Sequence, residues 1–391
     1  MKEQAVIHAD GNYEDLTKLL QNIGVKNILL VCGHSIYLNE INDYFENIEK
    51  EGIKVVRFMD FTPNPIYDDI VEGVNLFHEE NCDMIIAVGG GSAIDVAKCI
   101  KLWSNLPENS NYLGSRIIPN DLPFVAIPTT AGTGSEATRY AIIYHGGEKQ
   151  SVVDDSCIPD FVLFDPSLLR TLPDMQKKVT MMDTLCHAIE SFWSVNSTEK
   201  SREYSRIAIK LVMDNMGSYL KLPALNEKYN ELCGRSFDFE YSQDDAIRNM
   251  LLAANIAGKA INITGTTAPH AMSYKMTSIY GIPHGHAVAI ALPRVWEYMY
   301  KNIDRCSDLR GSTYLGAAFD EIAYCMECGK TADAIELFDF ILGQINLKKV
   351  KCRGKAELNK LADGVNLEKM KNNPIDFSKE EIQSLYKNIL A

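Results

Sequence analysis

Short apolar runs alternate with amphipathic stretches over the first half of the chain. The runs are rich in Val and Ile, which favour strands, although a short apolar run can also be a turn of a buried helix. They lie at residues 27–31, 54–58, 83–88, 124–127 and 161–164. Strands that are apolar on both faces and separated by helices are typical of a parallel sheet covered on both sides. We therefore predict an α/β domain, with helices at residues 14–21 and 38–52 packed against its sheet.

The pattern changes between Pro166 and Pro173 and is almost entirely helical beyond them. Apolar residues then recur with helical spacing at residues 175–194, 201–220, 243–263, 286–301, 317–329, 331–344 and 379–389. The polar and aromatic stretch at residues 233–241 is predicted to be a loop. A chain of 391 residues is also too long for one compact core. The sequence therefore predicts a parallel-sheet α/β domain over residues 1–174 and an all-α domain over residues 175–391.

Two glycine-rich loops follow successive predicted strands. One is Gly89-Gly90-Gly91-Ser92, and the other, at residues 128–138, is also rich in hydroxyl groups; we expect each to open a helix. Glycine lets the backbone approach a phosphate closely, and a helix N-terminus directs N–H groups at it. Flexible turns have the same composition, and neither loop is a G-x-G-x-x-G fingerprint. Two such loops at neighbouring strand ends favour a phosphate or dinucleotide site.

Four of the eight histidines lie within residues 181–286. Asp183 and His187 are four positions apart in a predicted helix, so their side chains point from one face. His270 and His284 follow later, and with this pair they can close a cage of three imidazoles and one carboxylate. Mixed ligation of this kind suits Zn(II) or Fe(II). Each part alone also fits an ordinary ion pair or a buried helix histidine, so the metal site rests on the whole set.

Composition excludes several classes of partner. The net charge is −13 and no basic run appears, so we expect no nucleic-acid partner. No apolar run reaches the roughly 18 residues of a membrane helix, and the N-terminus lacks the apolar core of a signal peptide. Ten irregularly spaced cysteines fit reduced thiols in the cytoplasm better than a disulfide framework. We interpret the only CxxC, Cys325 to Cys328, as structural, and we expect a cytoplasmic protein without a membrane partner.

A dinucleotide site combined with such a metal site suggests metal-assisted hydride transfer. The metal would act as a Lewis acid on a carbonyl oxygen, and the nicotinamide would supply or accept the hydride. The sequence therefore predicts an oxidoreductase, although periodicity alone does not establish one.

Several stretches together carry a resemblance to a known family. They are residues 63–65 (PNP), residues 89–92 (GGGS) with Asp95 and Lys98, residues 128–136 (PTTAGTGSE), Asp183 with residues 187–190 (HAIE), and residues 283–285 (PHG). Through them the chain resembles the iron-containing (type III) alcohol dehydrogenases from Leu29 to Leu390. The resemblance implies a Rossmann-like N-domain, a helical C-domain and a homodimer or higher homo-oligomer. It also implies one divalent metal, Fe(II) first and Zn(II) second, held by Asp183, His187, His270 and His284.

The same resemblance implies a set of residues for NADPH or NADH. Gly89, Gly90, Gly91 and Ser92 would hold the pyrophosphate. Asn64, Asp95, Thr129, Thr130, Thr133 and Lys149 would line the cofactor. Without the resemblance, Asn64 is equally well a turn residue between two prolines, and Lys149 a solvated charge.

Two departures from the family pattern change what we expect. Many members carry a further histidine four residues after the third metal ligand as a proton relay, and here that position is Tyr274. A tyrosine with a pKa near ~10 is a poorer base at neutral pH. The relay therefore falls to Tyr274, His286, cofactor hydroxyls or water, and these alternatives stay open.

The second departure concerns the cofactor. NAD-specific members place an aspartate after the first predicted strand, and here Gly33 stands there, followed by His34 and Ser35. An aspartate would repel the 2′-phosphate of NADPH, so its absence predicts that NADPH is accepted, and the preference between NADPH and NADH stays open.

The substrate prediction rests on three short stretches of sequence. Residues 136–141 (EATRYA), 190–198 (ESFWSVNST) and 270–274 (HAMSY) resemble the phosphonoacetaldehyde reductase branch of the family. Those enzymes reduce phosphonoacetaldehyde to 2-hydroxyethylphosphonate in phosphonate biosynthesis. The guanidinium of Arg139 could bind a phosphonate through two hydrogen bonds, or it could instead form a structural ion pair.

Three rival functions remain. The first is a short-chain primary alcohol or diol dehydrogenase. The second is a dehydroquinate synthase-like lyase. Such lyases share the two-domain organisation but lack the sequence found here at residues 130–136 (TAGTGSE). The third is a non-catalytic dinucleotide sensor, which would need a broken metal site, whereas all four ligand types are present.

Overall fold

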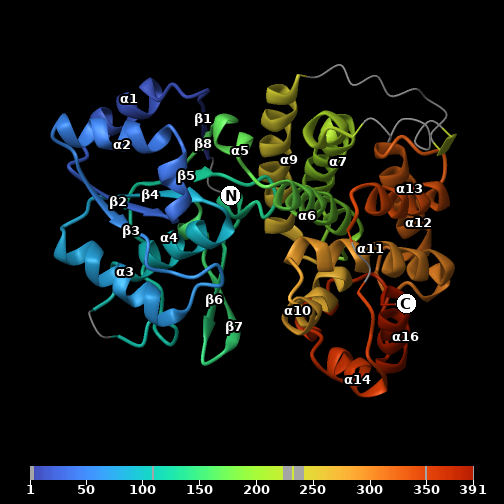
Figure 1. The fold of residues 1–391 in the computed structure, drawn as a ribbon. Helices are drawn as coiled ribbons and strands as arrows, with labels where there is room; N and C mark the ends of the chain where they lie inside the picture. Colours follow the sequence, from blue (N-terminus) through green and yellow to red (C-terminus); the bar gives the residue numbers. More distant parts are fainter. Residues whose placement is uncertain (1–3, 108–109, 223–230, 233–241, 348–349, 391) are drawn as a thin grey trace. The chain divides into compact units, whose positions relative to one another are not determined.

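The protein is described by a computed structural model that covers residues 4–107, 110–222, 231–232, 242–347 and 350–390 (Figure 1). The chain divides into two compact units, Met1–Leu172 and Pro173–Ala391. The first contains the strands and the second is helical. The predicted fold class is confirmed, because a parallel sheet in the first unit is followed by a unit built of helices.

The first unit is built on a six-stranded parallel sheet with the order β1-β8-β5-β4-β2-β3. Its strands are β1 (Ala5–His8), β2 (Asn27–Cys32), β3 (Lys54–Phe58), β4 (Met84–Gly89), β5 (Phe124–Pro128) and β8 (Phe161–Phe164). All five predicted strands are present. The sequence missed β1, which is short, lies at the sheet edge beside β8 and has no fully buried side chain, so it carries little apolar signal.

Helices pack on the sheet according to the alternation of its side chains. Leu29 and Val31 of β2 and Ile85 of β4 point to one face, where they join a core that includes residues of α3 (Tyr67–Glu79) and α4 (Gly91–Trp103). The neighbouring residues point to the other face. The remaining helices of this unit are α1 (Glu14–Ile23), α2 (Ile41–Lys50), the short α5 (Ser167–Arg170) and the 3-10 turns η1 (His34–Leu38) and η3 (Asp155–Cys157).

The helix predicted after the second glycine-rich loop is wrong. That loop leads into one 3-10 turn, η2 (Ser135–Ala137), and then into the antiparallel hairpin β6 (Tyr140–His145) and β7 (Glu148–Val153). Residues 140–145 alternate between buried and less buried positions, as a strand with one buried face does. Gly146 and Gly147 both have positive φ, 60° and 79°, which a two-residue hairpin turn requires. This Gly-Gly signal was present in the sequence.

The described residues of the second unit form helices joined by loops. The helices are α6 (Asp174–Trp193), α7 (Glu199–Leu220), α9 (Gln243–Thr264), α10 (Ala268–Tyr280), α11 (His284–Lys301), η4 (Ile303–Arg305), α12 (Gly311–Cys325), α13 (Thr331–Gln344), α14 (Lys355–Asp363), α15 (Leu367–Met370) and α16 (Lys379–Ile389). All seven predicted helices are present, and α12 begins earlier than predicted, at Gly311. The sequence missed α10, α14 and the single turn α15. The loop predicted at residues 233–241 lies outside the described residues.

Two further observations concern the described residues only. None of their helices combines the length and the apolar character that crossing a membrane requires. Cys325 and Cys328 are buried and carry free thiols, at and just beyond the end of α12.

Helix α6 is the centre of the helical unit. It packs against α7, α9 and α11, which surround it in Figure 1. From Val179 to Trp193 every residue of α6 is buried, whether apolar or polar. A helix that is enclosed on all sides carries its polar side chains into the protein interior, where each needs a partner.

Candidate active site

Helix α6 presents three ionisable side chains from one face. Asp183, His187 and Glu190 are spaced i, i+4 and i+7, so they follow one another along that face. All three are buried, and Glu190 is fully so. Burying two carboxylates and an imidazole is costly unless they are paired or bind a metal, so their surroundings define the site.

Glu190 holds the beginning of α10 and the imidazole of His270. Its Oε2 accepts hydrogen bonds from the backbone N–H of Thr267 at 2.7 Å and from the Thr267 hydroxyl at 2.9 Å. Its Oε1 lies 2.5 Å from Nδ1 of His270. The carboxylate thus sits at the N-terminus of α10, where the helix dipole favours a negative charge. Because Nδ1–H of His270 points to Glu190, its Nε2 points toward Asp183.

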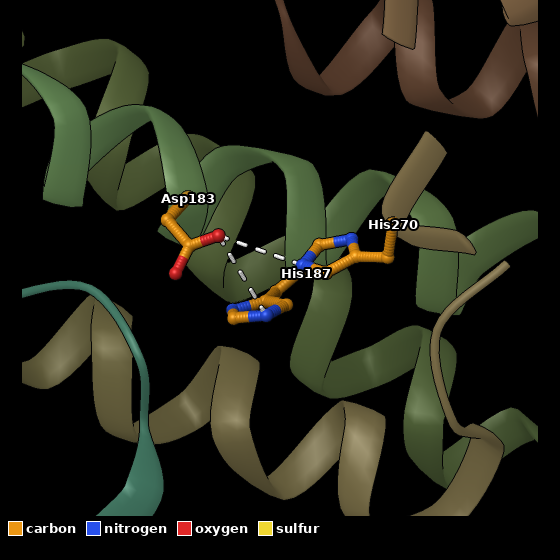
Figure 2. A group of neighbouring side chains, drawn as sticks. All are labelled: Asp183, His187 and His270. Carbon is orange, nitrogen blue, oxygen red and sulfur yellow. Dashed lines mark ion pairs between the residues drawn. The ribbon is translucent and has the colours of Figure 1, made fainter. Parts of the chain in front are cut away.

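Asp183, His187 and His270 form a compact group, drawn in Figure 2. Oδ1 of Asp183 lies 3.5 Å from Nε2 of His270 and 3.9 Å from Nε2 of His187. The two imidazole rings stack with their centroids 4.6 Å apart. Ligand atoms bound at about 2.1 Å to one tetrahedral or octahedral ion lie about 3.0 to 3.4 Å apart, close to these spacings.

The group fits a divalent metal. Within the described part of the chain, Oδ1 of Asp183 and Nε2 of His270 are buried without a hydrogen-bond partner, although they face each other. Buried polar atoms in this position are normally satisfied, and an ion between them would satisfy both. Two imidazoles and one carboxylate are a donor set that suits Fe(II) and also Zn(II).

The electrostatics of the group favour an anionic Asp183 and a neutral His187. Burial raises the pKa of Asp183, but the nearby imidazoles of His187, His270 and His284 outweigh it and hold this pKa below its usual value. Burial lowers the pKa of His187 to about 4, which leaves the neutral imidazole that a metal ligand must be.

His270 behaves differently without a metal. Burial lowers its pKa, but the charges of Glu190 and Asp183 outweigh burial and raise the pKa to about 10. A metal ion would take the place of the proton on Nε2.

The fourth ligand expected from the resemblance, His284, lies next to the group without joining it. Its ring centroid is 5.3 Å from that of His270, and its Nδ1 is 3.4 Å from the Ser273 hydroxyl. Tyr274 stacks on the His284 ring, with centroids 5.6 Å apart and planes 3° from parallel. The structure therefore places Tyr274 against a predicted ligand. His286 is buried two positions further along α11, about 200° around the helix from His284, so it points to another side.

A glycine allows α11 to approach α6 here. A Cβ on Gly285 would lie 2.1 Å from the carbonyl oxygen of Val179 and 3.0 Å from Cβ of Asp183. Only a residue without a side chain fits between the two helices, and this close packing brings His284 beside Asp183.

Comparisons with known proteins agree with this site. A family model described as iron-containing alcohol dehydrogenase matches residues 4–166. A second model, described as the C-terminal part of the Fe-containing alcohol dehydrogenase family, matches residues 177–390. The chain belongs to the iron-containing alcohol dehydrogenase family. The family predicted from the sequence is thereby confirmed, and the protein is an enzyme of this class.

Individual relatives differ in their substrates. The chain is 32% identical over 292 residues to the NAD-dependent methanol dehydrogenase of Bacillus methanolicus, covering 73% of this chain and 71% of that protein. It is 30% identical over 323 residues to the 1,3-propanediol dehydrogenase of Citrobacter freundii, covering 81% and 76%. The fold matches a sulfoacetaldehyde reductase from Bifidobacterium kashiwanohense solved with NAD+, with a TM-score of 0.84, 23% identity and coverage of 100% and 98%.

In this iron-containing alcohol dehydrogenase, the two glycine-rich loops pack directly on each other. The N–H of Thr129 donates to the carbonyl oxygen of Gly89 at 3.0 Å. A Cβ on Gly90 would lie 3.2 Å from Oγ1 of Thr130, and one on Gly91 would lie 2.9 Å from Cγ2 of Thr133. The threonine side chains thus occupy the space that side chains on the glycines would need, so this packing of the two loops requires glycine at positions 90 and 91.

Asn64 and Lys149, two further predicted cofactor residues, lie on segments that hydrogen bonds connect to α4 or to each other. The Ser92 hydroxyl donates to the carbonyl oxygen of Pro63, which fixes the exposed turn that carries Asn64. The N–H of Tyr144 in β6 donates to Pro65, so the hairpin is tied to the same turn. Lys149 is exposed on β7 opposite Tyr144.

The carboxylate of Asp95 forms hydrogen bonds within the protein. It accepts them from the Ser135 hydroxyl at 2.5 Å and from the N–H of Ile142 at 3.0 Å. Lys98, fully buried, donates to Ser135 at 3.0 Å, to Thr138 at 3.2 Å and to the carbonyl of Tyr140 at 2.7 Å. Asp95 and Lys98 therefore hold the hydroxyl-rich loop and β6 in place, and direct contact of Asp95 with the cofactor stays a prediction.

Gly33 and Arg139 have contrasting surroundings. Gly33 follows β2, the second strand of the chain because β1 precedes it, and a Cβ there would meet no atom within 4 Å. His34, next to it, is exposed.

Arg139 pairs with Asp155 at 3.5 Å and lies over the ring of Tyr140. This pairing favours a structural role for Arg139, which was one of the two alternatives from the sequence. Binding of a phosphonate by Arg139 stays a prediction.

Sequence reasoning missed the part played by Glu190. Its spacing on the same helix face as Asp183 and His187 was a usable signal, but its partner Thr267 lies at the start of a helix that the sequence did not predict. Lys369 was also missed. It follows no motif, and the tertiary structure brings it to Tyr274 and Thr266.

Proposed function

We propose that this enzyme reduces a small aldehyde to a primary alcohol with NADPH or NADH at a divalent metal site. The observation that carries the proposal is the buried group of Asp183, His187 and His270, with Glu190 behind His270. A divalent metal held there, with His284 as a further ligand, would supply Lewis acidity toward a carbonyl oxygen, and the nicotinamide would supply the hydride. The chain's own part is to hold Asp183 anionic, His187 neutral and His270 in one orientation.

We propose phosphonoacetaldehyde as the aldehyde and 2-hydroxyethylphosphonate as the product, within phosphonate biosynthesis. The support is the wording of residues 136–141, 190–198 and 270–274, which resembles the phosphonoacetaldehyde reductase branch. Arg139 follows the hydroxyl-rich loop, and its guanidinium is the group we propose for binding the phosphonate, although its pairing with Asp155 supports a structural role.

A specific observation favours a second candidate. The curated relatives include a methanol dehydrogenase and a 1,3-propanediol dehydrogenase, whose names point to small neutral alcohols. A short-chain primary alcohol or diol dehydrogenase is therefore the alternative. A dehydroquinate synthase-like lyase has less support, because the alcohol dehydrogenase family models match both halves of the chain.

Several finer features are part of the same proposal. We propose Fe(II) as the metal, with Zn(II) as the alternative, because the donor set suits both. We propose NADPH as the preferred cofactor, because open space at Gly33 leaves room for a 2′-phosphate. A homodimer in the cytoplasm remains a prediction from the sequence.

The proton relay is also part of the proposal. The stacking of Tyr274 on His284 supports a role in which the Tyr274 ring orients a metal ligand. His286 points elsewhere from α11, so we propose that cofactor hydroxyls or water deliver the proton.

One experiment separates the candidates. The metal-reconstituted enzyme is mixed with NADPH and either phosphonoacetaldehyde or butanal, and the nicotinamide absorbance is followed. Faster oxidation with phosphonoacetaldehyde supports the proposal. Oxidation with butanal alone would leave a dehydrogenase and remove the phosphonate, and no oxidation with either would return the lyase to consideration. An Arg139→Ala variant whose KM for phosphonoacetaldehyde is unchanged would remove Arg139 from the substrate site.

A further inference from the structure

A chain of buried hydrogen bonds runs from Trp193, the last residue of α6, to the candidate metal site. The indole Nε1–H of Trp193 donates to the hydroxyl of Thr267 at 2.9 Å, and that hydroxyl donates to Oε2 of Glu190 at 2.9 Å. Oε1 of Glu190 lies 2.5 Å from Nδ1 of His270. None of these four residues is more than 2% exposed, so the bonds lie in the protein interior, where they are strong.

The chemistry of Trp193 fixes the direction of every bond in this chain. An indole N–H can only donate, so the Thr267 oxygen accepts from it. The hydroxyl proton of Thr267 is then directed at Oε2 of Glu190, which also accepts from the N–H of Thr267 at 2.7 Å. A carboxylate that receives both donors is held in its ionised form and accepts a third bond, from Nδ1–H of His270. The lone pair of the neutral imidazole is then on Nε2, which faces Asp183 (Figure 2).

The packing of Trp193 holds the first member of the chain in place. Its ring centroid lies 5.7 Å from that of Trp296 in α11 and 5.9 Å from that of Phe319 in α12. All three rings are fully buried, so the indole has little freedom to turn and its N–H keeps one direction. Thr267 is the residue that precedes the first turn of α10. The chain therefore connects the end of α6 to the start of α10, the helix that carries His270.

We propose that Thr267 and Trp193 are positioning residues for the metal ligand His270, and that they act through Glu190. Their part is to fix the tautomer and the orientation of the imidazole before a metal ion binds. A ligand that is already oriented loses less freedom on binding, so the two residues raise the affinity of the site for a divalent metal. This inference rests on the proposed metal site and adds to it two residues that lie outside the ligand set.

Thr267→Val tests the proposal, because it keeps nearly the same shape and removes the hydroxyl. The metal-free variant is titrated with Co(II), and the visible absorption of the bound ion is followed. We expect the dissociation constant to rise by about 3- to 10-fold, less than the roughly 10- to 100-fold for a residue bonded directly to a metal ligand. Thr267→Ser returns the hydroxyl and should return the affinity. A Thr267→Val variant that binds Co(II) as tightly as wild type would overturn the inference.

Thr277→Val is the matched control for this substitution. Thr277 lies on the same helix, α10, and its buried hydroxyl oxygen has no hydrogen-bond partner within the described part of the chain. The same change there should leave the affinity for Co(II) unchanged. An equal loss of affinity in the two valine variants would show that the effect comes from the packing of α10, and the role of the Thr267 hydroxyl would fall.

Trp193→Phe tests the other member of the pair. Removing the indole N–H should raise the dissociation constant for Co(II) by about 2- to 5-fold, the range for one hydrogen bond between neutral groups. Trp296→Phe is its control, because it removes the same volume from the same aromatic cluster, and Nε1 of Trp296 has no hydrogen-bond partner among the described residues. Equal losses in the two phenylalanine variants would overturn the role of Trp193.

A double variant shows whether the two residues act in series. If Trp193 acts through the Thr267 hydroxyl, adding Trp193→Phe to Thr267→Val should weaken Co(II) binding no further than Thr267→Val alone. Additive losses would show that Trp193 acts by another route and would remove it from the proposal.

The Co(II) titration separates this inference from the proposed function, because it uses no aldehyde. A purely structural role would lower the free energy of unfolding and leave the dissociation constant of the folded protein unchanged, and this outcome would overturn the inference. A wild-type enzyme that binds Co(II) but reduces no aldehyde would remove the proposed function alone. Variants that reduce aldehydes and bind Co(II) like wild type would remove the inference alone, and a wild-type enzyme that binds no Co(II) would remove both.

Discussion

Oε1 of Glu190 lies 2.5 Å from Nδ1 of His270, although the two residues are 80 positions apart in the sequence. This contact fixes which imidazole nitrogen points toward Asp183 and leaves Nε2 available for a metal. The other oxygen of Glu190 binds the N-terminus of α10, so one carboxylate sets both the position of the helix and the orientation of the histidine.

Replacing Glu190 by glutamine should weaken metal binding. The amide keeps the size of the side chain but loses the negative charge that orients His270, and partners of this kind typically contribute about 10- to 100-fold to metal affinity. The measurement is the dissociation constant for Co(II), followed by its visible absorption. Glu199→Gln is the matched control, because Glu199 is exposed and pairs with Arg202 and Arg206 on α7. Equal affinities in the two variants would contradict the role given to Glu190.

A methyl group on Gly285 should separate α11 from α6. The Cβ of Gly285→Ala would lie 2.1 Å from the carbonyl oxygen of Val179, so the helices must move apart, at a cost of about 1–3 kcal/mol in the free energy of unfolding. Metal affinity should fall with it, because His284 begins the same helix. Denaturant unfolding of the metal-free protein measures the first effect and Co(II) titration the second.

Gly343→Ala is the comparison for that experiment. A Cβ there meets no atom within 4 Å in helix α13, so this variant should be slightly more stable than wild type, by about 0.4–1 kcal/mol. Two variants of equal stability would show that α6 and α11 are not in close contact at Gly285.

An aspartate at position 33 should change the cofactor preference. The space around Gly33 is open and its φ is −87°, so Gly33→Asp fits without strain. Its carboxylate would repel a 2′-phosphate, and we expect the ratio of kcat/KM for NADPH over NADH to fall by about tenfold or more. Gly33→Asn, which adds the same volume without charge, should lower the ratio less. If both variants lower the ratio of kcat/KM by the same amount, the effect is steric and the charge at position 33 does not act on the 2′-phosphate.

Removing the buried charge of Lys98 should destabilise the first unit. Lys98→Met leaves Asp95 in the interior without its cation at 3.9 Å, and breaking a buried pair in this way costs about 3–5 kcal/mol. The double variant Asp95→Asn with Lys98→Met should recover part of the loss, because no uncompensated charge remains. Denaturant unfolding measures both. A single variant as stable as wild type would show that the network of Asp95, Lys98 and Ser135 does not hold the loop.

The sequence by itself determined the features that depend on neighbouring positions. Runs of Val and Ile marked five strands of the parallel sheet, helical spacing marked seven helices, and the i, i+4 pair of Asp183 and His187 marked the helix that carries the candidate site. These signals are local, because side-chain direction repeats with the period of the backbone. Family resemblance extended them to His270 and His284.

Only the tertiary structure decided the contacts between distant segments. Local pattern could not show that Glu190 faces His270, that Gly285 lets α11 reach α6, or that Lys369 stands over Tyr274. It also misjudged the stretch after Gly134, which forms a hairpin because its alternating side chains pack on α4, a choice made by the core. Proximity of this kind comes from helix packing and loop anchoring, which no periodicity in a single stretch encodes.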